Sequence, residues 1–228
     1  MLVAYNYRRR MRRERVFKDR LDPLDISDAH LLRYYRFPRR EIINLIEELR
    51  PALERNTRRS HALPVSTQVL VALKFYASGS FQSIVADAAG INQSSVSRII
   101  NLVTEILSEK TKTEIIMPSG GFEVNQTIQD FARISGFPRV IGAIDGTHIP
   151  IKAPSAEEPI YVNRKNFHSL NVQVVCNASH LVLNYSARYP GSTHDAFIWN
   201  TSDIRRRFHN GEFGDAILLG KYLFTIPQ

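Results

Sequence analysis

An apolar segment that ends in a carboxylate constrains the fold of this chain more than any other stretch. Residues 140–144 read Val-Ile-Gly-Ala-Ile, which predicts a buried strand, and Asp145 and Gly146 follow directly. A carboxylate is costly to bury without a partner, and a divalent cation is one suitable partner. Asp-Gly is also a common turn dipeptide, so the same residues fit an ordinary turn. The pattern by itself leaves a metal site and a turn both open.

The composition indicates a folded chain without a membrane span. Its 228 residues suffice for one large domain or two ordinary ones, and 43% of them are hydrophobic and 23% charged. No apolar run is long enough to span a bilayer, and no apolar segment follows the basic N-terminus, so we expect no signal peptide. The single cysteine, Cys176, excludes an internal disulfide and is expected to be a small core residue, which fits a reducing compartment.

Positive charge is concentrated near the N-terminus. Residues 1–60 contain 16 Lys and Arg against 9 Asp and Glu, whereas the remaining residues contain 14 against 13. Such asymmetry indicates a polyanionic partner, and nucleic acid is the leading candidate. We assign residues 1–20 to a basic arm whose densest part fits a DNA contact, a nuclear-import signal or a solvated tail. That part contains five arginines: Arg8, Arg9, Arg10, Arg12 and Arg13.

Residues 21–120 are predicted to be helical, with a helix-turn-helix at about 81–107. A short helix at 81–89, a Gly90-Ile91 turn and a longer helix at 92–107 fit this motif, with Ala86, Ile91, Val96 and Ile99 closing the joint. The second helix begins with side chains suited to base edges and phosphates in a DNA major groove, namely Gln93, Ser94, Ser95, Ser97 and Arg98. An ordinary helical hairpin with solvated polar side chains is the alternative, and the basic arm favours DNA binding.

Other helices are predicted by the same period of apolar residues. One spans 30–37, a second begins at Pro38, a third spans 67–77 with Ser66 as its N-cap, and a fourth spans 127–135. Residues 110–121, which contain Pro118, Gly120 and Gly121, are expected to form a connector.

From residue 138 the chain becomes strand-rich. We expect a hairpin from 171–177 and 181–189, a helix from Ser192 through Phe208, and a short strand at 216–219. Together with the strand that precedes Asp145, this is the order of an RNase H-like core. In that core, carboxylates from several elements converge on the first strand and hold two magnesium ions for phosphodiester cleavage.

Asp145 is the first candidate metal ligand and Asp195 the second. Asp195 stands at the start of the predicted helix, where a capping role is the alternative. His148 and His194 lie near these two carboxylates in the sequence. They are better suited to structural or phosphate contacts, because magnesium prefers oxygen ligands.

Three segments resemble consecutive signatures of the PIF/Harbinger DDE transposases, and most closely the domesticated nucleases of that family. They are Ala-Ile-Asp-Gly-Thr-His-Ile (143–149), Asn-Arg-Lys (163–165) with His-Ser-Leu-Asn-Val-Gln (168–173), and Pro-Gly-Ser-Thr-His-Asp (190–195). The resemblance implies an RNase H-like nuclease domain at 138–228, within a mixed α+β or α/β chain. It also implies dependence on Mg²⁺ or Mn²⁺, and Asp145 and Asp195 as the first acidic sites.

The same resemblance implies a nuclear location, with the cytoplasm as a second one, and a Myb/SANT-like DNA-binding partner that aids nuclear import. Asn166 stands where the family usually has Gly. Because Asn tolerates a positive φ better than most residues, the turn is expected to survive.

The end of the chain departs from the family pattern. After Gly220 the family continues with an Asp, and later with a Glu on a C-terminal helix, whereas Lys221 follows here and the sequence ends at Gln228. We therefore expect the nuclease domain to be incomplete, as in a truncated or alternatively spliced product.

Three functional hypotheses follow from these observations. The first is a transposase-derived, metal-dependent DNA endonuclease without transposase activity. The second is a DNA-binding or partner-binding protein with an inactive catalytic domain. The third, a metal-dependent hydrolase of small phosphate esters, leaves the helix-turn-helix and the basic arm unexplained. Ancestry favours the first, and the missing acids favour the second for this 228-residue form.

Overall fold

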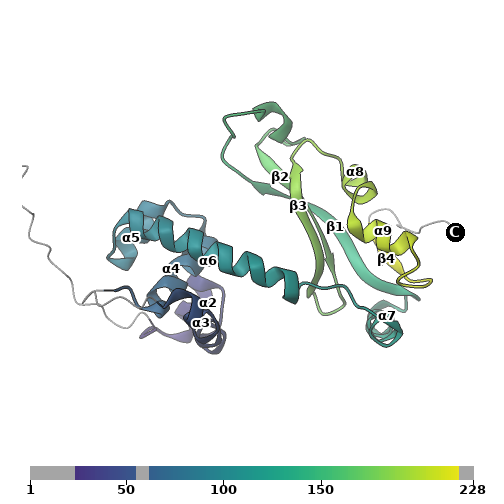
Figure 1. Cartoon of the computed structure of the whole chain (residues 1–228), viewed down its shortest axis with the longest axis horizontal. Helices are drawn as coiled ribbons and strands as arrows, with labels where there is room; N and C mark the ends of the chain where they lie inside the picture. The colour runs from purple at the N-terminus through teal and green to yellow at the C-terminus, as the bar shows by residue number, and fades with distance from the viewer. Residues whose placement is uncertain (1–23, 55–61, 221–228) are drawn as a thin grey trace, which may run out of the picture. The chain divides into compact units, whose positions relative to one another are not determined.

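The computed structural model describes residues 24–54 and 62–220. They form two compact units that divide between Lys110 and Thr111 (Figure 1). The basic arm at residues 1–20, with its arginines, and Lys221 lie outside the described residues. Among the described helices, none combines the length and the apolar character needed to cross a bilayer.

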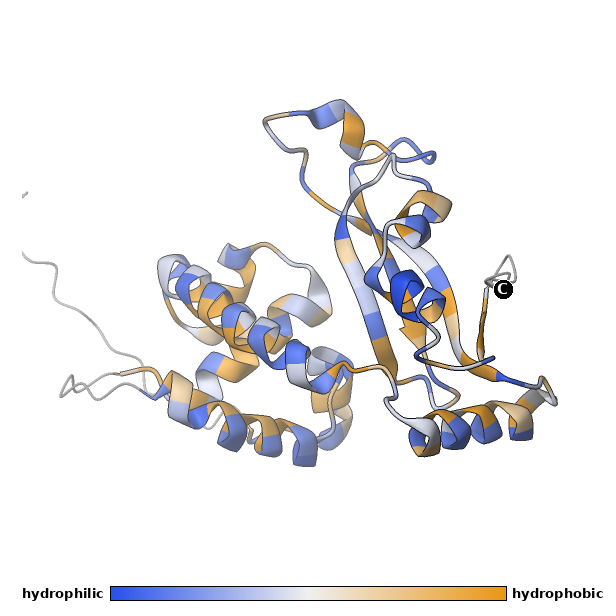
Figure 2. Cartoon of the chain, turned by 45° about the vertical axis from the view of Figure 1, so that its right-hand side comes forward, coloured by the Kyte–Doolittle hydropathy of each residue, from blue (hydrophilic) through white to orange (hydrophobic). Residues whose placement is uncertain are grey.

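The first unit is helical. Its described helices are α2 (Asp28–Tyr35), α3 (Arg39–Leu53), α4 (Val65–Ser78), α5 (Gln82–Ala89) and α6 (Gln93–Glu114). Their apolar faces meet in one core, and Figure 2 shows apolar and hydrophilic residues alternating along these helices. The expected cap at Ser66 is wrong, because α4 begins at Val65 directly after Pro64. The expected start of the connector at residue 110 is also wrong, since α6 continues to Glu114.

The predicted helix-turn-helix is present in α5 and α6. Gly90 ends α5 in the left-handed conformation, with φ of 63°. The Ile91 amide then donates to the Ala86 carbonyl at 3.0 Å, which closes the turn. Ala86, Val96 and Ile99 are buried at the joint, and Ile91 packs against the same core. The four apolar positions therefore have the roles expected from the sequence.

The second unit is built on a four-stranded sheet with the strand order β3-β2-β1-β4. The chain runs through α7 (Gly121–Ser135), β1 (Val140–Pro150), the short 3₁₀ helix η1 (Glu158–Tyr161), β2 (Ser169–Cys176), β3 (Val182–Pro190), α8 (Asp195–Asn200), α9 (Asp203–His209) and β4 (Ile217–Leu219). Strand β2 pairs antiparallel with β1 and β3, and β4 lies parallel to β1. This is the expected RNase H-like order, so the predicted fold class is confirmed.

The first strand extends beyond its expected end. Strand β1 continues through Asp145 and Gly146 to Pro150, because β2 supplies a partner for each residue from Ala143 onward. Asp145 lies opposite Val174, and Gly146 lies opposite Gln173. The turn reading of Asp-Gly is therefore wrong, since both residues are part of a paired strand.

Helices α8 and α9 cover one face of the sheet near β1 and β4 (Figure 1). Trp199 and Ile204 from these helices share a core with Ile144, Val175 and Leu218 of the sheet. The expected single helix through Phe208 is two helices, because the chain breaks at residues 201–202.

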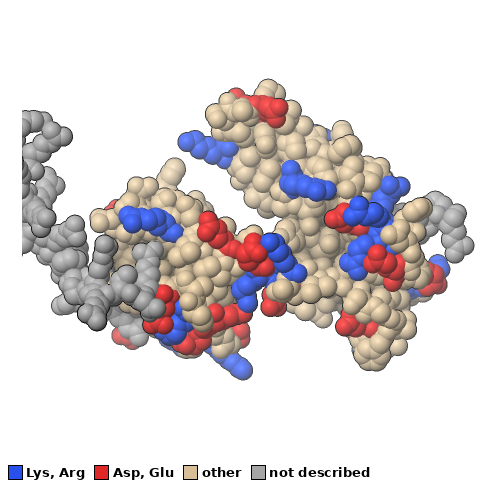
Figure 3. Space-filling model, in the orientation of Figure 1, with Lys and Arg blue, Asp and Glu red and all other residues tan. Residues whose placement is uncertain are grey.

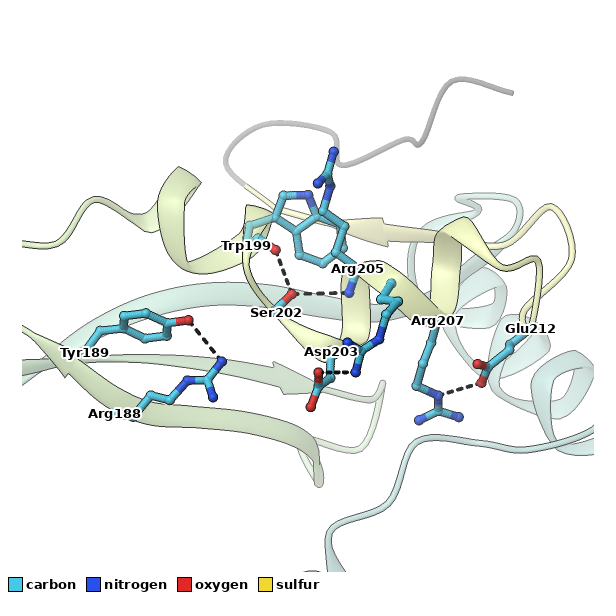
Figure 4. Close-up of polar contacts among 9 residues, drawn as sticks. Arg188, Tyr189, Trp199, Ser202, Asp203, Arg205, Arg207 and Glu212 are labelled. Atoms are coloured by element: carbon cyan, nitrogen blue, oxygen red, sulfur yellow. Dashed lines mark hydrogen bonds and ion pairs between the residues drawn. The ribbon is translucent and has the colours of Figure 1, made fainter.

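The break between α8 and α9 is stabilised by local hydrogen bonds (Figure 4). The Ser202 hydroxyl donates to the Trp199 carbonyl at 2.7 Å and accepts from the Arg205 amide at 3.2 Å. Tyr189 of β3 is joined to the break by a 2.7 Å hydrogen bond between its hydroxyl and that of Thr201. This bond, and then Arg188, lower the pKa of Tyr189 below its ordinary value.

Candidate active site

The Asp195 carboxylate lies directly against Gly146. A Cβ atom at position 146 would meet Asp195 Oδ1 at 2.6 Å and Cγ at 3.0 Å, so the carboxylate fills the space of a side chain. Gly146 is needed here for close approach rather than for a turn. The structure thus brings the first residue of α8 against the centre of β1, beside Asp145.

The Asp145 carboxylate accepts a hydrogen bond from the backbone amide of the next residue, Gly146. Successive residues of a strand face opposite sides of the sheet, so Asp145 begins on the face away from Asp195. Its carboxylate turns along the strand, and Oδ1 accepts the Gly146 amide at 2.9 Å. Both carboxylates are exposed, and that of Asp195 occupies the space that a side chain at position 146 would need.

Asn171 fixes the position of Asp195. Its side chain is 2% exposed, and Nδ2 donates to Asp195 Oδ1 at 2.7 Å and to the Thr193 carbonyl at 2.8 Å. In the part of the chain that the structure describes, the buried Asn171 Oδ1 has no hydrogen-bond partner. Asn171 was not among the predicted site residues, although a polar residue in an expected strand was a visible signal.

A second buried polar group lies beside the turn that leads to Asp195. Ser169 Oγ accepts Asn163 Nδ2 at 2.8 Å and lies 3.1 Å from His148 Nδ1. Gly191 packs so tightly here that a Cβ would meet Ser169 Oγ at 2.4 Å and the Tyr161 carbonyl at 2.5 Å. The turn at 190–193 therefore packs tightly against β2. His148 contacts Ser169 of the same strand, which is a structural role.

Asn166 adopts the conformation that the family comparison suggested. Its φ is 62°, and its amide donates to the Asn163 carbonyl at 2.9 Å. His168, near this turn, lies 2.9 Å from the Glu158 carboxylate through Nε2.

The candidate site has ligand atoms of the type that a divalent cation binds, but few of them. Asp145 and Asp195 offer carboxylate oxygens, which Mg²⁺ and Mn²⁺ prefer, and Mg²⁺ retains several waters when one or two carboxylates bind it. Within residues 24–54 and 62–220, no group of three His, Cys, Asp or Glu side chains could hold a metal ion. Nucleases of the DDE class generally use divalent metals.

The predicted DNA-reading side chains lie at the start of α6. Gln93, Ser94 and Arg98 are exposed, whereas Ser95 and Ser97 are half-buried. Arg98 Nε donates to the Ser94 carbonyl at 3.1 Å, and Gln93 Nε2 donates to Gln82 Oε1 at 3.3 Å. Figure 3 shows Lys and Arg interspersed with Asp and Glu on the visible face of each unit.

Residues 144–227 match the family of DDE superfamily endonucleases. "Putative nuclease HARBI1" of Rattus norvegicus is 41% identical over 208 residues, which cover 91% of this chain and 60% of the relative. The protein of that name in Homo sapiens is 40% identical over the same shares.

A plant relative is more distant. "Protein ALP1-like" of Arabidopsis thaliana is 31% identical over 153 residues, which cover 66% of this chain and 37% of the relative. The chain spans about 60% of the length of the animal relatives. No solved structure gave a significant match.

Proposed function

Because the chain belongs to the family of DDE superfamily endonucleases, we propose that the protein is a transposase-derived, divalent-metal-dependent nuclease that hydrolyses DNA phosphodiester bonds and lacks transposase activity. One observation carries the proposal. Asp195, the first residue of α8, lies against Gly146, the residue that follows Asp145 in β1 of an RNase H-like sheet.

Asp145 and Asp195 would hold the metal, with Mg²⁺ or Mn²⁺ as the cation. When bound, such ions supply an activated water and stabilise the leaving oxygen of the cleaved phosphodiester. The residues around the carboxylates restrict their motion: Gly146 admits Asp195, and the 190–193 turn holds the start of α8 against β2.

DNA is the proposed partner, bound by the helix-turn-helix with further phosphate contacts from the basic arm. The exposed start of α6 presents Gln93, Ser94 and Arg98 beside a tightly closed turn. A nuclear location and a Myb/SANT-like partner protein are proposed on the family resemblance alone.

Replacing Arg98 with Ala is expected to weaken DNA binding about tenfold and to reduce the slope of log affinity against log salt by about 1, if its guanidinium contacts a phosphate. Fluorescence anisotropy with a labelled duplex at several salt concentrations measures both quantities. Arg133→Ala removes one exposed charge from α7 instead and should leave both nearly unchanged. Equal losses in the two variants would indicate a nonspecific charge effect rather than a contact from α6.

A second candidate function is a DNA-binding or partner-binding protein with an inactive catalytic domain. Two observations favour it for the 228-residue chain. The described residues bring two carboxylates to Gly146, and Lys221 follows β4 at the place where the family pattern has an Asp. At this point of the sequence, therefore, the chain lacks a carboxylate that the family pattern supplies.

The second candidate predicts that the 228-residue chain binds DNA without nicking it above background in Mg²⁺ or Mn²⁺, because two-metal hydrolysis needs both ions held about 4 Å apart. Conversion of supercoiled plasmid to open circles is the measurement. Asp145→Asn provides the matched control, since it keeps the shape of the side chain. Metal-dependent nicking that disappears in Asp145→Asn would show that the two carboxylates suffice, and would exclude the inactive candidate.

A further inference from the structure

We propose that Asn171 is the positioning residue for Asp195: it holds one carboxylate oxygen against Gly146 and leaves the other oxygen available to a divalent cation. This role rests on the proposed function, because Asp195 is one of the two proposed metal ligands. Asn171 itself would not contact the substrate.

The hydrogen bonds of Asn171 define the geometry. Asn171 lies on β2 opposite His148 of β1, on the sheet face that α8 covers. Its Nδ2 donates to Asp195 Oδ1 at 2.7 Å and to the Thr193 carbonyl at 2.8 Å. Because both partners are acceptors, the bonding itself identifies the atom between them as the amide nitrogen. Both N–H bonds of Asn171 are thus used to fix α8 at its first residue.

Gly146 and Asn171 act on the same oxygen. Asp195 Oδ1 accepts from Asn171 and is the atom closest to the position of a Cβ on Gly146, at 2.6 Å, compared with 3.3 Å for Oδ2. Asp195 Oδ2 accepts no hydrogen bond from the residues that the structure describes. One oxygen is therefore held, and the other can bind a ligand.

Stability alone does not account for an amide at position 171. Asn171 Oδ1 is buried and has no hydrogen-bond partner among the described residues, which is unfavourable for folding. Val175, on the same face of the strand, is buried in the apolar core, and Val favours strands. A Val at 171 would avoid the unpaired acceptor but would leave Asp195 unrestrained. The hydrogen bond from Asn171 to the Asp195 carboxylate explains why an amide occupies position 171.

Metal affinity separates this role from a merely structural one. The 228-residue chain is titrated with Mn²⁺ by isothermal calorimetry, together with Asn171→Val and the matched control Asn163→Val. Asn163 is also a buried amide (5% exposed), but it bonds Ser169 and does not touch Asp195. Because loss of a side chain that orients a ligand typically lowers metal affinity 10–100-fold, we expect the Kd of Asn171→Val to rise about tenfold or more. Asn163→Val should keep the wild-type Kd within about twofold, although its melting temperature falls.

A second variant tests the same carboxylate without changing Asn171. Gly146→Ala places a Cβ 2.6 Å from Asp195 Oδ1 at a position whose φ is not positive, so the backbone itself tolerates Ala. We expect a comparable rise in the Kd for Mn²⁺. If Asn171→Val does not fold, Gly146→Ala still tests whether the position of the Asp195 carboxylate sets the Kd for Mn²⁺.

A metal-free measurement tests the contact directly. In NMR hydrogen exchange, the side-chain amide of Asn171 should exchange slowly in the wild type and faster in Asp195→Ala. Fast exchange in the wild type, or exchange unaffected by Asp195→Ala, would overturn the positioning role even without metal binding.

The outcomes distinguish the two proposals. If Asp195→Asn abolishes Mn²⁺ binding while Asn171→Val and Gly146→Ala bind as the wild type does, the positioning role is wrong and the proposed function stands. If Asp195→Asn binds Mn²⁺ like the wild type, the metal role of Asp195 is wrong, and amide exchange alone decides whether Asn171 holds the carboxylate.

Discussion

Replacing Asp145 with Asn is expected to abolish the rise in melting temperature that Mn²⁺ or Mg²⁺ gives the 228-residue chain. Asp145 and Asp195 are the two carboxylates proposed to hold the cation, and replacing Asp145 with Asn removes one of these two charged oxygen ligands. A cation that binds only the folded chain stabilises it by about 2.7 kcal/mol at a hundredfold excess over its Kd. That corresponds to a rise of roughly 10 °C for the second unit alone.

Differential scanning fluorimetry with increasing Mn²⁺ measures this effect. Asp215→Asn is the matched control, because Asp215 is an exposed carboxylate of the same unit that pairs with Arg139 at 3.4 Å instead of facing Gly146. The control should keep the full metal-dependent rise. A rise of equal size in Asp145→Asn would place the cation elsewhere and remove the main support for the nuclease proposal.

Local patterns were sufficient to predict the order of elements in the second unit. The apolar run before Asp145, the two alternating segments of the hairpin and the short strand at 216–219 each correspond to an observed strand. The helix-turn-helix was also predictable, because Gly90 and the apolar residues around it are close together in sequence. These features are visible in local sequence patterns, although the strands themselves pair over long sequence distances.

The extent of β1 could not be predicted, because it depends on a partner strand distant in sequence. Asp and Gly are both poor strand formers, and side by side they indicate a turn. In the structure, β2 pairs with every residue from Ala143 to Pro150 and keeps Asp145 and Gly146 extended. Tertiary pairing therefore overrides the local preference. Gly146 is needed because it leaves space for the Asp195 carboxylate of α8.

The buried face of β2 is the opposite of the one that its hydrophobic pattern indicates. Apolar residues at 170, 172 and 174 alternate with polar ones, which predicts that the polar side chains face solvent. Instead Ser169, Asn171 and Gln173 are buried and the apolar positions are half-buried. The polar face is buried because it holds the 190–193 turn and Asp195. Sequence reasoning missed Asn171 for this reason, since a polar residue in an alternating strand is ordinarily assigned to solvent.

Gly191→Ala is expected to destabilise the second unit by about 2–3 kcal/mol, at the upper end of the usual range for overpacked sites. The added Cβ would lie 2.4 Å from Ser169 Oγ, 2.5 Å from the Tyr161 carbonyl oxygen and 2.9 Å from the Ser169 carbonyl oxygen. Two of these atoms belong to the backbone, so a rotamer change cannot relieve the clash. The melting temperature should fall by on the order of 10 °C.

Gly121→Ala is the matched control for Gly191→Ala. A Cβ at position 121 meets no atom within 4 Å, and the residue begins α7, so Ala should be neutral or slightly stabilising there. Because Gly191 lies in the turn that ends at Asp195, its replacement should also reduce the metal-dependent stabilisation, which the control should retain. If Gly191→Ala lost thermal stability but kept its full response to Mn²⁺, Asp195 would be positioned independently of this turn. The hydrogen bond to Asn171 would then be sufficient to hold the carboxylate against β1.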